Sequence, residues 1–269
     1  LQPRLISKRS FTQLQRIKIK IRMSGRVGSI TTDIIADGLV FNMDPANRAS
    51  YPKTGTTTTD TIGNQVGTLS SSPTFDPSEG EGVFDYDNTD YISYDSNSNL
   101  SGLTKATFSA WFNFGLLSTS AEPIFAGNRS NVANGFSMYN WTHNHSVSFF
   151  VMKTSTSNET NVTIRPSTFG DALAINTWYC MTAVFDGTIA GDDNSLKGYW
   201  NGIYRSNSNT LSNSNVTSLA TNPDLIVGTY FNGYGHYFQG SIGPIHIYNR
   251  ALSANEVLHN YNALKGRFE

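Results

Sequence analysis

The stretch that decides the fold is Phe238–Glu269, which reads FQGSIGPIHIYNRALSANEVLHNYNALKGRFE. Its first part, to about residue 249, has the short apolar pattern of a strand. Beyond Ser253, apolar residues recur every three or four positions, as on one face of a helix. Ser253 and Glu256 have the spacing of a capping box, and Gly266 stands where a helix would stop. We therefore predict a strand and then a short amphipathic helix, about residues 253–264, which lies against the rim of a β domain and covers an edge.

Short strand patterns separated by turn signals fill the chain from Asp37 to this ending. Typical segments are DGLVFNMD, EPIFAG, GFSMYNW, SVSFFVM, NTWYCMTAVFDG and LKGYWNGIYRS. In ATFSAWFNFG, from residue 106, aromatic residues fall on both faces of the strand, which is typical of a strand between two packed layers. Many short strands with frequent turns predict an all-β protein, an antiparallel sandwich or barrel. Trp111, Trp178 and Trp200 are expected in its core.

The cysteine count and the lengths of the apolar runs exclude several classes of protein. Among 269 residues there is one cysteine, Cys180, so no disulfide can form within the chain, and its apolar surroundings predict a buried side chain. There is no run of 18 apolar residues, so no membrane-spanning helix is expected.

The charge is unevenly distributed. Residues 1–26 hold eight of the 19 basic residues and none of the 20 acidic ones. Within this basic arm, isoleucines alternate with basic residues, which predicts a strand with one apolar and one basic face. The segment is Arg16, Ile17, Lys18, Ile19, Lys20, Ile21 and Arg22.

Such a strand needs a sheet edge, on its own domain or on a neighbour, and we expect residues 1–36 to dock to a protein partner. Phosphate binding to nucleic acid is the disfavoured alternative. In a third reading residues 1–22 have no native role, because Met23 resembles a natural start.

The segments FDYDNTDYISYD, ATFSAWF, INTWYCMTAVFDG, LKGYWNG and FQGSIGPIHIYNRALSANEV occur in an order and spacing that resemble one family. It is the laminin-G-like jelly rolls of the concanavalin A-like lectin/glucanase superfamily, and the resemblance runs from about Gly38 to Leu264. It implies a jelly-roll domain over residues 37–269, with the strand and helix of Phe238–Glu269 as the usual ending. One departure is Gly243-Pro244, where relatives often carry an acidic pair.

A narrower resemblance is carried by DGLVFNMDPANRASYPKTGT and IYNRALSANEVLHNYNALKGRF. These stretches are similar to virion structural proteins of tailed bacteriophages. The resemblance implies a fibre, whisker, decoration or other surface component of a virus particle. Its implied partners are other capsid, neck or tail proteins. A homo-oligomer is expected on general grounds of symmetry, and no membrane partner is expected because no apolar run is long enough.

Catalysis is not expected. Glycoside cleavage needs two flanking carboxylates, and the glucanase branch takes them from an E-x-D-x-x-E strand that is missing here. Glu79 and Glu81 stand among glycines and are read as a solvated loop. Neither G-x-S-x-G nor a plausible cysteine nucleophile is present.

Two loops combine aromatic side chains with polar partners, as sugar sites do. They yield eight candidate residues: Tyr139, Trp141, His143, His145, Tyr230, Asn232, Tyr234 and His236. Sugar binding competes here with packing in the core or against a neighbouring subunit. His143 and His145 could also bind a metal, although a polar loop is favoured because no third ligand has a clear spacing.

No cofactor is required by the sequence. Calcium remains an alternative, because it takes clustered oxygen ligands and Asp186, Asp192 and Asp193 lie close together in the sequence. Solvated turns are the competing reading of these residues.

Three functional hypotheses follow. The leading one is a virion structural protein at the particle surface, docked through its arm and binding host surface glycans weakly but in many copies. The second is a carbohydrate-binding module of a cell-surface or secreted protein. The third is a jelly-roll coat protein whose arm binds nucleic acid.

Overall fold

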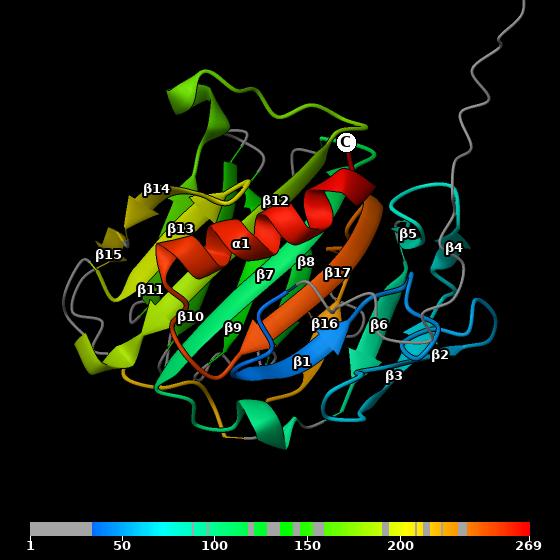
Figure 1. The fold of residues 1–269 in the computed structure, drawn as a ribbon, viewed down its shortest axis with the longest axis horizontal. Coiled ribbons are helices and arrows are strands. Elements are labelled where there is room, and N and C mark those ends of the chain that lie inside the picture. The colour runs from blue at the N-terminus through cyan, green and yellow to red at the C-terminus, as the bar shows by residue number, and fades with distance from the viewer. Residues whose placement is uncertain are drawn as a thin grey trace, which may run out of the picture.

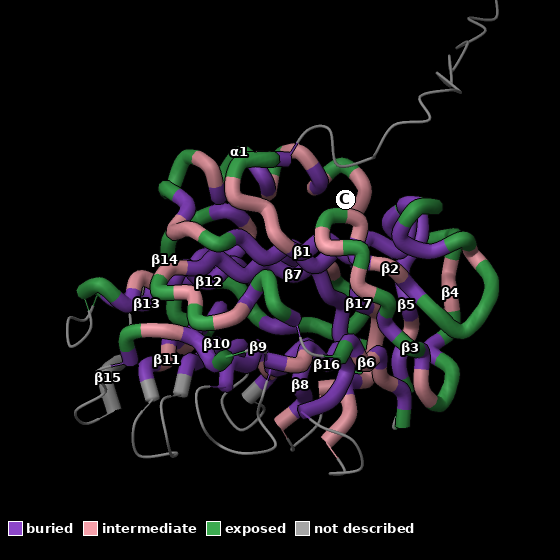
Figure 2. Tube along the Cα trace, turned by 90° about the horizontal axis from the view of Figure 1, so that it is seen from below, coloured by how far each residue is buried: buried purple, intermediate pink, exposed green. Residues whose placement is uncertain are grey.

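The computed structural model describes residues 34–87, 89–95, 97–117, 121–127, 135–141, 146–152, 159–189, 194–207, 209–211, 216–221, 223–230 and 236–269. These residues form two antiparallel sheets stacked face to face (Figures 1 and 2), which confirms the predicted sandwich. No helix in this part of the chain is long and apolar enough to cross a membrane.

The first sheet, sheet A, has eight strands. In order across the sheet they are β14 (Ile203–Asn207), β13 (Leu196–Trp200), β12 (Trp178–Asp186), β7 (Lys105–Phe114), β17 (Gly240–Tyr248), β5 (Val83–Tyr86) and β4 (Thr74–Asp76), with β1 (Leu39–Met43) paired to β17. A register shift between Ile242 and Ile245 interrupts the pairing of β17 with β7. The first part of β17 pairs with β5 and its second part with β1.

The second sheet, sheet B, has nine strands. In order they are β15 (Asn209–Leu211), β11 (Glu159–Ile164), β10 (Ser146–Met152), β9 (Phe136–Trp141), β8 (Glu122–Gly127), β16 (Leu225–Val227), β6 (Tyr91–Tyr94), β3 (Val66–Ser70) and β2 (Thr57–Thr59). Because β16 lies between β8 and β6, residues far apart in sequence become neighbours in this sheet.

Aromatic side chains from both sheets fill the space between them. Phe108 of β7 contacts Phe136 and Phe149 of sheet B, with ring centroids 4.8 and 4.7 Å apart. The alternation in β7 is as predicted: Phe108, Phe112 and Phe114 belong to this core, whereas Trp111 points to the opposite face. Trp200 is buried in this core, as expected. The same expectation is wrong for Trp111, which is buried on the outer face of sheet A, and for Trp178, which is half-buried beside it.

The helix α1 (Ala254–Leu264) confirms the predicted element, but its predicted position is wrong. It crosses the outer face of sheet A over its central strands rather than the rim (Figure 1). The outer face carries Trp111, Cys180, Val184 and Tyr248, which are all buried under this layer. Large side chains on the middle strands need cover, and this requirement places the helix on the face.

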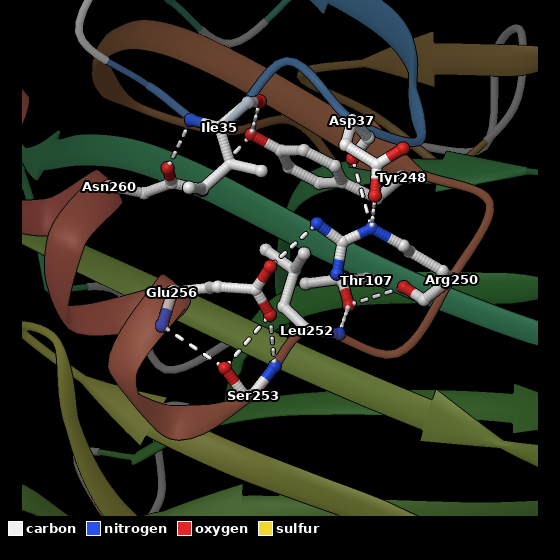
Figure 3. A network of polar contacts seen from close by, with 9 residues as sticks. All are labelled: Ile35, Asp37, Thr107, Tyr248, Arg250, Leu252, Ser253, Glu256 and Asn260. Carbon is white, nitrogen blue, oxygen red and sulfur yellow. Dashed lines mark hydrogen bonds and ion pairs between the residues drawn. The ribbon is translucent and has the colours of Figure 1, made fainter.

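Hydrogen bonds fix the helix to the sheet (Figure 3). The predicted capping box is present, since the Ser253 side chain accepts from the Glu256 N–H and Glu256 Oε2 accepts from the Ser253 N–H at 2.8 Å. Glu256 Oε1 also lies 2.7 Å from Arg250 Nη2. These contacts, led by the one from Arg250, lower the pKa of Glu256 to about 2. Thr107 Oγ1 donates to the Arg250 carbonyl and accepts from the Leu252 N–H.

Residues 34–36, the last part of the predicted arm, belong to this covering layer. Ile34 is buried in a cluster with Trp111, Cys180 and Leu264. The Ile35 N–H donates to Asn260 Oδ1 at 2.8 Å, and the Ile35 carbonyl accepts from the Tyr248 hydroxyl at 3.0 Å (Figure 3). The first described residues are therefore anchored to sheet A and to the helix.

The residues after α1 continue as a short 3₁₀ turn, Lys265–Arg267, that includes Gly266. The Arg267 guanidinium makes two hydrogen bonds to the Asp44 carboxylate, at 2.8 and 2.9 Å. Phe268 stacks on Trp111 at 4.5 Å and also contacts the Trp178 ring at 4.6 Å. The end of the chain thus closes over the outer face of sheet A.

Candidate functional site

The two predicted sugar-binding loops meet on sheet B. Tyr139 comes from β9, whereas Tyr230 and His236 come from the loop that joins β16 to β17. The ring centroids of Tyr139 and Tyr230 are 6.1 Å apart, and those of Tyr230 and His236 are 5.9 Å apart. We call Tyr139, Tyr230 and His236 the aromatic site.

The direction of Tyr139 follows from the alternation along β9. Phe136 and Met138 point into the core, so Tyr139 points to the outer face of sheet B. Its neighbours across the strands are Ser148 of β10 and Pro123 of β8. The Phe150 ring lies 5.5 Å from the Tyr139 ring, which is therefore held from the side.

The described ends of the β16–β17 loop are held together by hydrogen bonds. Thr229 and Tyr237 form an isolated bridge, and Thr229 Oγ1 donates to the His236 carbonyl at 2.8 Å. The Phe238 N–H donates to the Gly228 carbonyl at 2.7 Å. Gly228 has a φ of 89°, a conformation that favours glycine, and a Cβ there would lie 2.7 Å from the Tyr86 ring.

The aromatic site has a buried centre and exposed ends. Tyr230 is 5 % exposed, whereas Tyr139 and His236 are partly exposed. The Nδ1 atom of His236 is buried and has no hydrogen-bond partner among the described residues. The partly exposed Tyr139 and His236 therefore offer ring surface for an apolar ligand face, and their polar atoms other than the buried Nδ1 of His236 can serve polar groups.

A buried polar pair lies behind the aromatic site, on the inner side of the same strands. Glu122 of β8 is paired with Asn140 of β9, and they are 2 % and 1 % exposed. Within the described part of the chain, both polar atoms of the Asn140 side chain lack a hydrogen-bond partner. Glu122 is not among the predicted site residues, although an acidic residue at the start of the apolar strand EPIFAG was a usable signal.

The other predicted sugar-binding residues cannot be placed at the site. Trp141 is the last residue of β9, opposite Ser146, but its side chain lies outside the described part of the structure. His143, His145, Asn232 and Tyr234 also lie outside the described residues, as does the arm segment Arg16–Arg22. Their roles stay predictions.

Of the three calcium candidates, the structure describes Asp186. Its carboxylate receives Lys105 Nζ at 2.8 Å and hydrogen bonds from Thr188. Partial burial acts to raise the pKa of Asp186, but these contacts lower it overall. Asp192 and Asp193 lie outside the described residues, within which no group of three His, Cys, Asp or Glu side chains could hold a metal ion. Calcium binding stays a prediction.

The structure shows the environments of Cys180 and Glu79, two residues weighed as catalytic candidates. Cys180 is buried, which raises the pKa of its thiol to about 12, so the reactive thiolate is not formed at neutral pH. Glu79 is exposed and accepts a hydrogen bond from Trp178 Nε1 at 3.1 Å.

Comparison with known proteins agrees with this architecture. Residues 86–258 match the model of the Concanavalin A-like lectin/glucanases superfamily. No curated protein sequence matches the chain.

Solved structures with the same fold share little sequence with the chain. One is domain 4 of AbnA, a GH43 extracellular arabinanase from Geobacillus stearothermophilus, in complex with arabinotriose, with 15 % identity, a TM-score of 0.61, and 84 % of this chain and 98 % of that one covered. Another is the botulinum neurotoxin serotype D ligand binding domain in complex with N-acetylneuraminic acid, with 14 % identity, a TM-score of 0.64, and 87 % of this chain covered. The chain spans about half of that neurotoxin domain, with 52 % covered.

Proposed function

Because the chain belongs to the Concanavalin A-like lectin/glucanases superfamily, we propose that it is a carbohydrate-binding domain whose sugar ligand contacts the aromatic site. The observation that carries this proposal is the meeting of Tyr139 with Tyr230 and His236. Core packing alone does not account for an outward-facing tyrosine that stays partly exposed beside a partly exposed histidine. Structures of this fold bound to arabinotriose and to N-acetylneuraminic acid add support.

The proposed activity is binding without catalysis. The three side chains of the aromatic site include no carboxylate, whereas hydrolysis of a glycosidic bond uses two. A shallow site of this kind gives weak binding that becomes useful when many copies act together. We propose that further copies of the chain supply this multivalency.

We propose that this domain is carried on the surface of a virus particle. The support is the resemblance of two stretches, residues 37–56 and 247–268, to bacteriophage virion proteins. The structure places them side by side, since Leu39 and Phe41 of β1 pair with Tyr248 and Ile247 of β17. A motif set that folds as one unit is better support than two separate matches.

Binding is tested on a glycan array and then by calorimetry with the best sugar. Tyr139→Ala should weaken binding roughly tenfold, since an aromatic contact worth about 1.4 kcal/mol corresponds to that factor. The matched control is Tyr204→Ala, an exposed tyrosine on β14 in the other sheet, which should bind normally. Equal affinity of the two variants, or no glycan bound by the wild type, would refute the proposal.

Whether the domain belongs to a virus particle is tested separately, by mass spectrometry of gradient-purified particles from the source culture. Abundant peptides from the sandwich in the particles would support a virion component. If the protein is found instead in host envelopes or medium, the virion part fails and the carbohydrate-binding module remains.

A further inference from the structure

Strand β4 leaves one edge of sheet A open. It is the last strand of the sheet, and its described ladder hydrogen bonds run to β5 alone. In Figure 1, β4 lies at the opposite end of the sheet from β14. An open edge of this kind presents unpaired N–H and carbonyl groups to which another strand can add.

The two faces of this edge differ in character. Phe75 of β4 lies opposite Phe84, and its ring packs against those of Tyr51 and Phe84 at 5.4 and 6.3 Å. Thr74 and Asp76 point to the other face, as does Asp85, which pairs with Thr74. A strand added to β4 would therefore continue an apolar surface on one side and an acidic one on the other.

The acidic side carries negative charge that the described residues do not neutralise. Asp76, Glu79, Glu81 and Asp85 lie on β4, on β5 and in the loop between them, and none of them forms an ion pair among the described residues. Burial raises the pKa of Asp85, and the charges of Asp76 and Glu79 raise it further although Ser241 donates a hydrogen bond to it. Arg267 reaches this loop, where its Nε donates to the Gly80 carbonyl at 2.9 Å, but its ion pair is with Asp44. Lys53 lies over the Phe75 ring at 5.5 Å, on the apolar side.

The segment Arg16–Arg22 has the matching pattern. Its basic residues, Arg16, Lys18, Lys20 and Arg22, fall on one face of a strand, and its three isoleucines fall on the other. Two other edge strands match it less well. On sheet A, β14 carries Arg205 and pairs with Lys197 of β13, which would repel the segment. On sheet B, β2 is three threonines, with no charge to attract it.

The described chain also begins near this edge. Ile34 lies in the cluster of Trp111 and Leu264, against which Phe268 packs. The Phe268 ring lies so close to Gly80, in the β4–β5 loop, that a Cβ on Gly80 would be 2.3 Å from it. Residues 23–33 can span about 36 Å when extended, so the segment can return to β4 from Ile34.

We propose that residues 16–22 add as a strand to the open edge of β4 in the same chain, with the isoleucines on the Phe75 side and the basic residues on the Asp76 side. The same chain is the occupant because a short tether gives an effective concentration in the millimolar range, far above that of a second copy in dilute solution. Opposite charges across neighbouring strands add to the backbone hydrogen bonds. The basic arm and the acidic domain then form one unit.

The first test uses the full chain and needs no substitution. An equal mixture of unlabelled and ¹⁵N-labelled protein is treated with a carbodiimide that joins carboxylates to amines in contact, and the products are mapped by mass spectrometry. Links from Lys18 or Lys20 to Asp76, Glu79 or Glu81, within one isotope only, are expected. Mixed-isotope links would show that a second copy is the occupant, and links to carboxylates elsewhere would show that β4 is not the site; either result overturns the proposal.

The second test measures the rate of trypsin cleavage. Docking should slow cleavage at Arg16, Lys18, Lys20 and Arg22 severalfold relative to Arg4, Lys8 and Arg9 of the same chain. The double variant Glu79→Gln and Glu81→Gln should lose this protection, and so should the wild type in high salt. Glutamine keeps an acceptor for Trp178 Nε1, so the fold is not expected to suffer.

The control for this variant is Asp95→Asn with Asp171→Asn, which removes two exposed acids outside the β4–β5 region. It should keep the protection. Equal cleavage of all arm sites in the wild type, or the same protection in both double variants, would overturn the proposal. Neither test depends on glycan binding, so its failure and that of the proposed function can be told apart.

Discussion

The contact between Arg267 and Asp44 permits a sharp prediction about stability. It joins the last turn of the chain to the residue after β1, and the two side chains are 7 % and 1 % exposed. Asp44 also accepts from the Ala46 N–H at 3.1 Å, and Arg267 Nε donates to the Gly80 carbonyl at 2.9 Å. Arg267→Met removes the cation but leaves Asp44 buried without a counter-charge.

An uncompensated buried charge of this kind costs about 3–5 kcal/mol of the free energy of unfolding. The control is Lys105→Met, which breaks an equally short ion pair, 2.8 Å to Asp186, whose lysine side chain is 43 % exposed. Screening by water should keep that loss at about 0–1 kcal/mol. Both values are read from urea unfolding at neutral pH, monitored by tryptophan fluorescence.

A second comparison separates the charge from the packing. The double variant Asp44→Asn with Arg267→Met has no buried carboxylate, so it should be more stable than Arg267→Met alone. The reasoning is refuted if Arg267→Met costs no more than Lys105→Met. It is also refuted if removing the Asp44 charge brings no recovery.

Three further predictions concern other parts of sheet A and the helix that covers it. Burial is the main reason that the pKa of His246 falls from 6.5 to about 4. Between these pH values the unfolded chain binds more protons than the folded one, so stability falls as the pH falls. Urea unfolding should show a loss of about 3 kcal/mol from pH 6.5 to 4, and His246→Phe should lack this loss. Ser253→Ala removes the capping box of α1 and should cost about 1 kcal/mol in the same assay, whereas Ser253→Asp should retain most of the stability. Gly240→Ala should abolish soluble expression or lower Tm strongly, because φ is 140° and the new Cβ would lie 2.1 Å from the Asn113 carbonyl oxygen; an unchanged Tm would contradict this geometry.

The sequence was sufficient for the features that depend on local patterns. Alternation in β7 predicted aromatic residues on both faces of the strand, and the capping box at Ser253 predicted the start of α1. The position of the helix was not predictable in this way. It depends on Trp111, Val184 and Tyr248 meeting on one face, and they come from three strands whose order the sequence does not state.

The aromatic site was likewise predictable only in part from the sequence. Each of the two aromatic loops could be selected from its own composition, because aromatic residues among glycine and asparagine suit recognition better than packing. Their meeting requires β16 to pair with β8, and β8 with β9, which no local pattern encodes. Glu122 was missed for a related reason: its burial depends on Asn140 and on the strand order, and the strand itself looks apolar.

The two faces of the sandwich are unequally available for recognition. The outer face of sheet A carries α1, residues 34–37 and the Phe268 ring, so its central strands have little surface left for a ligand (Figure 2). The outer face of sheet B carries Tyr139, which stays partly exposed there. If residues 16–22 also close the β4 edge of sheet A, the side of sheet B that holds the aromatic site becomes the natural binding surface. The arm and the sugar site then depend on opposite sides of one sandwich, and each can be altered without the other.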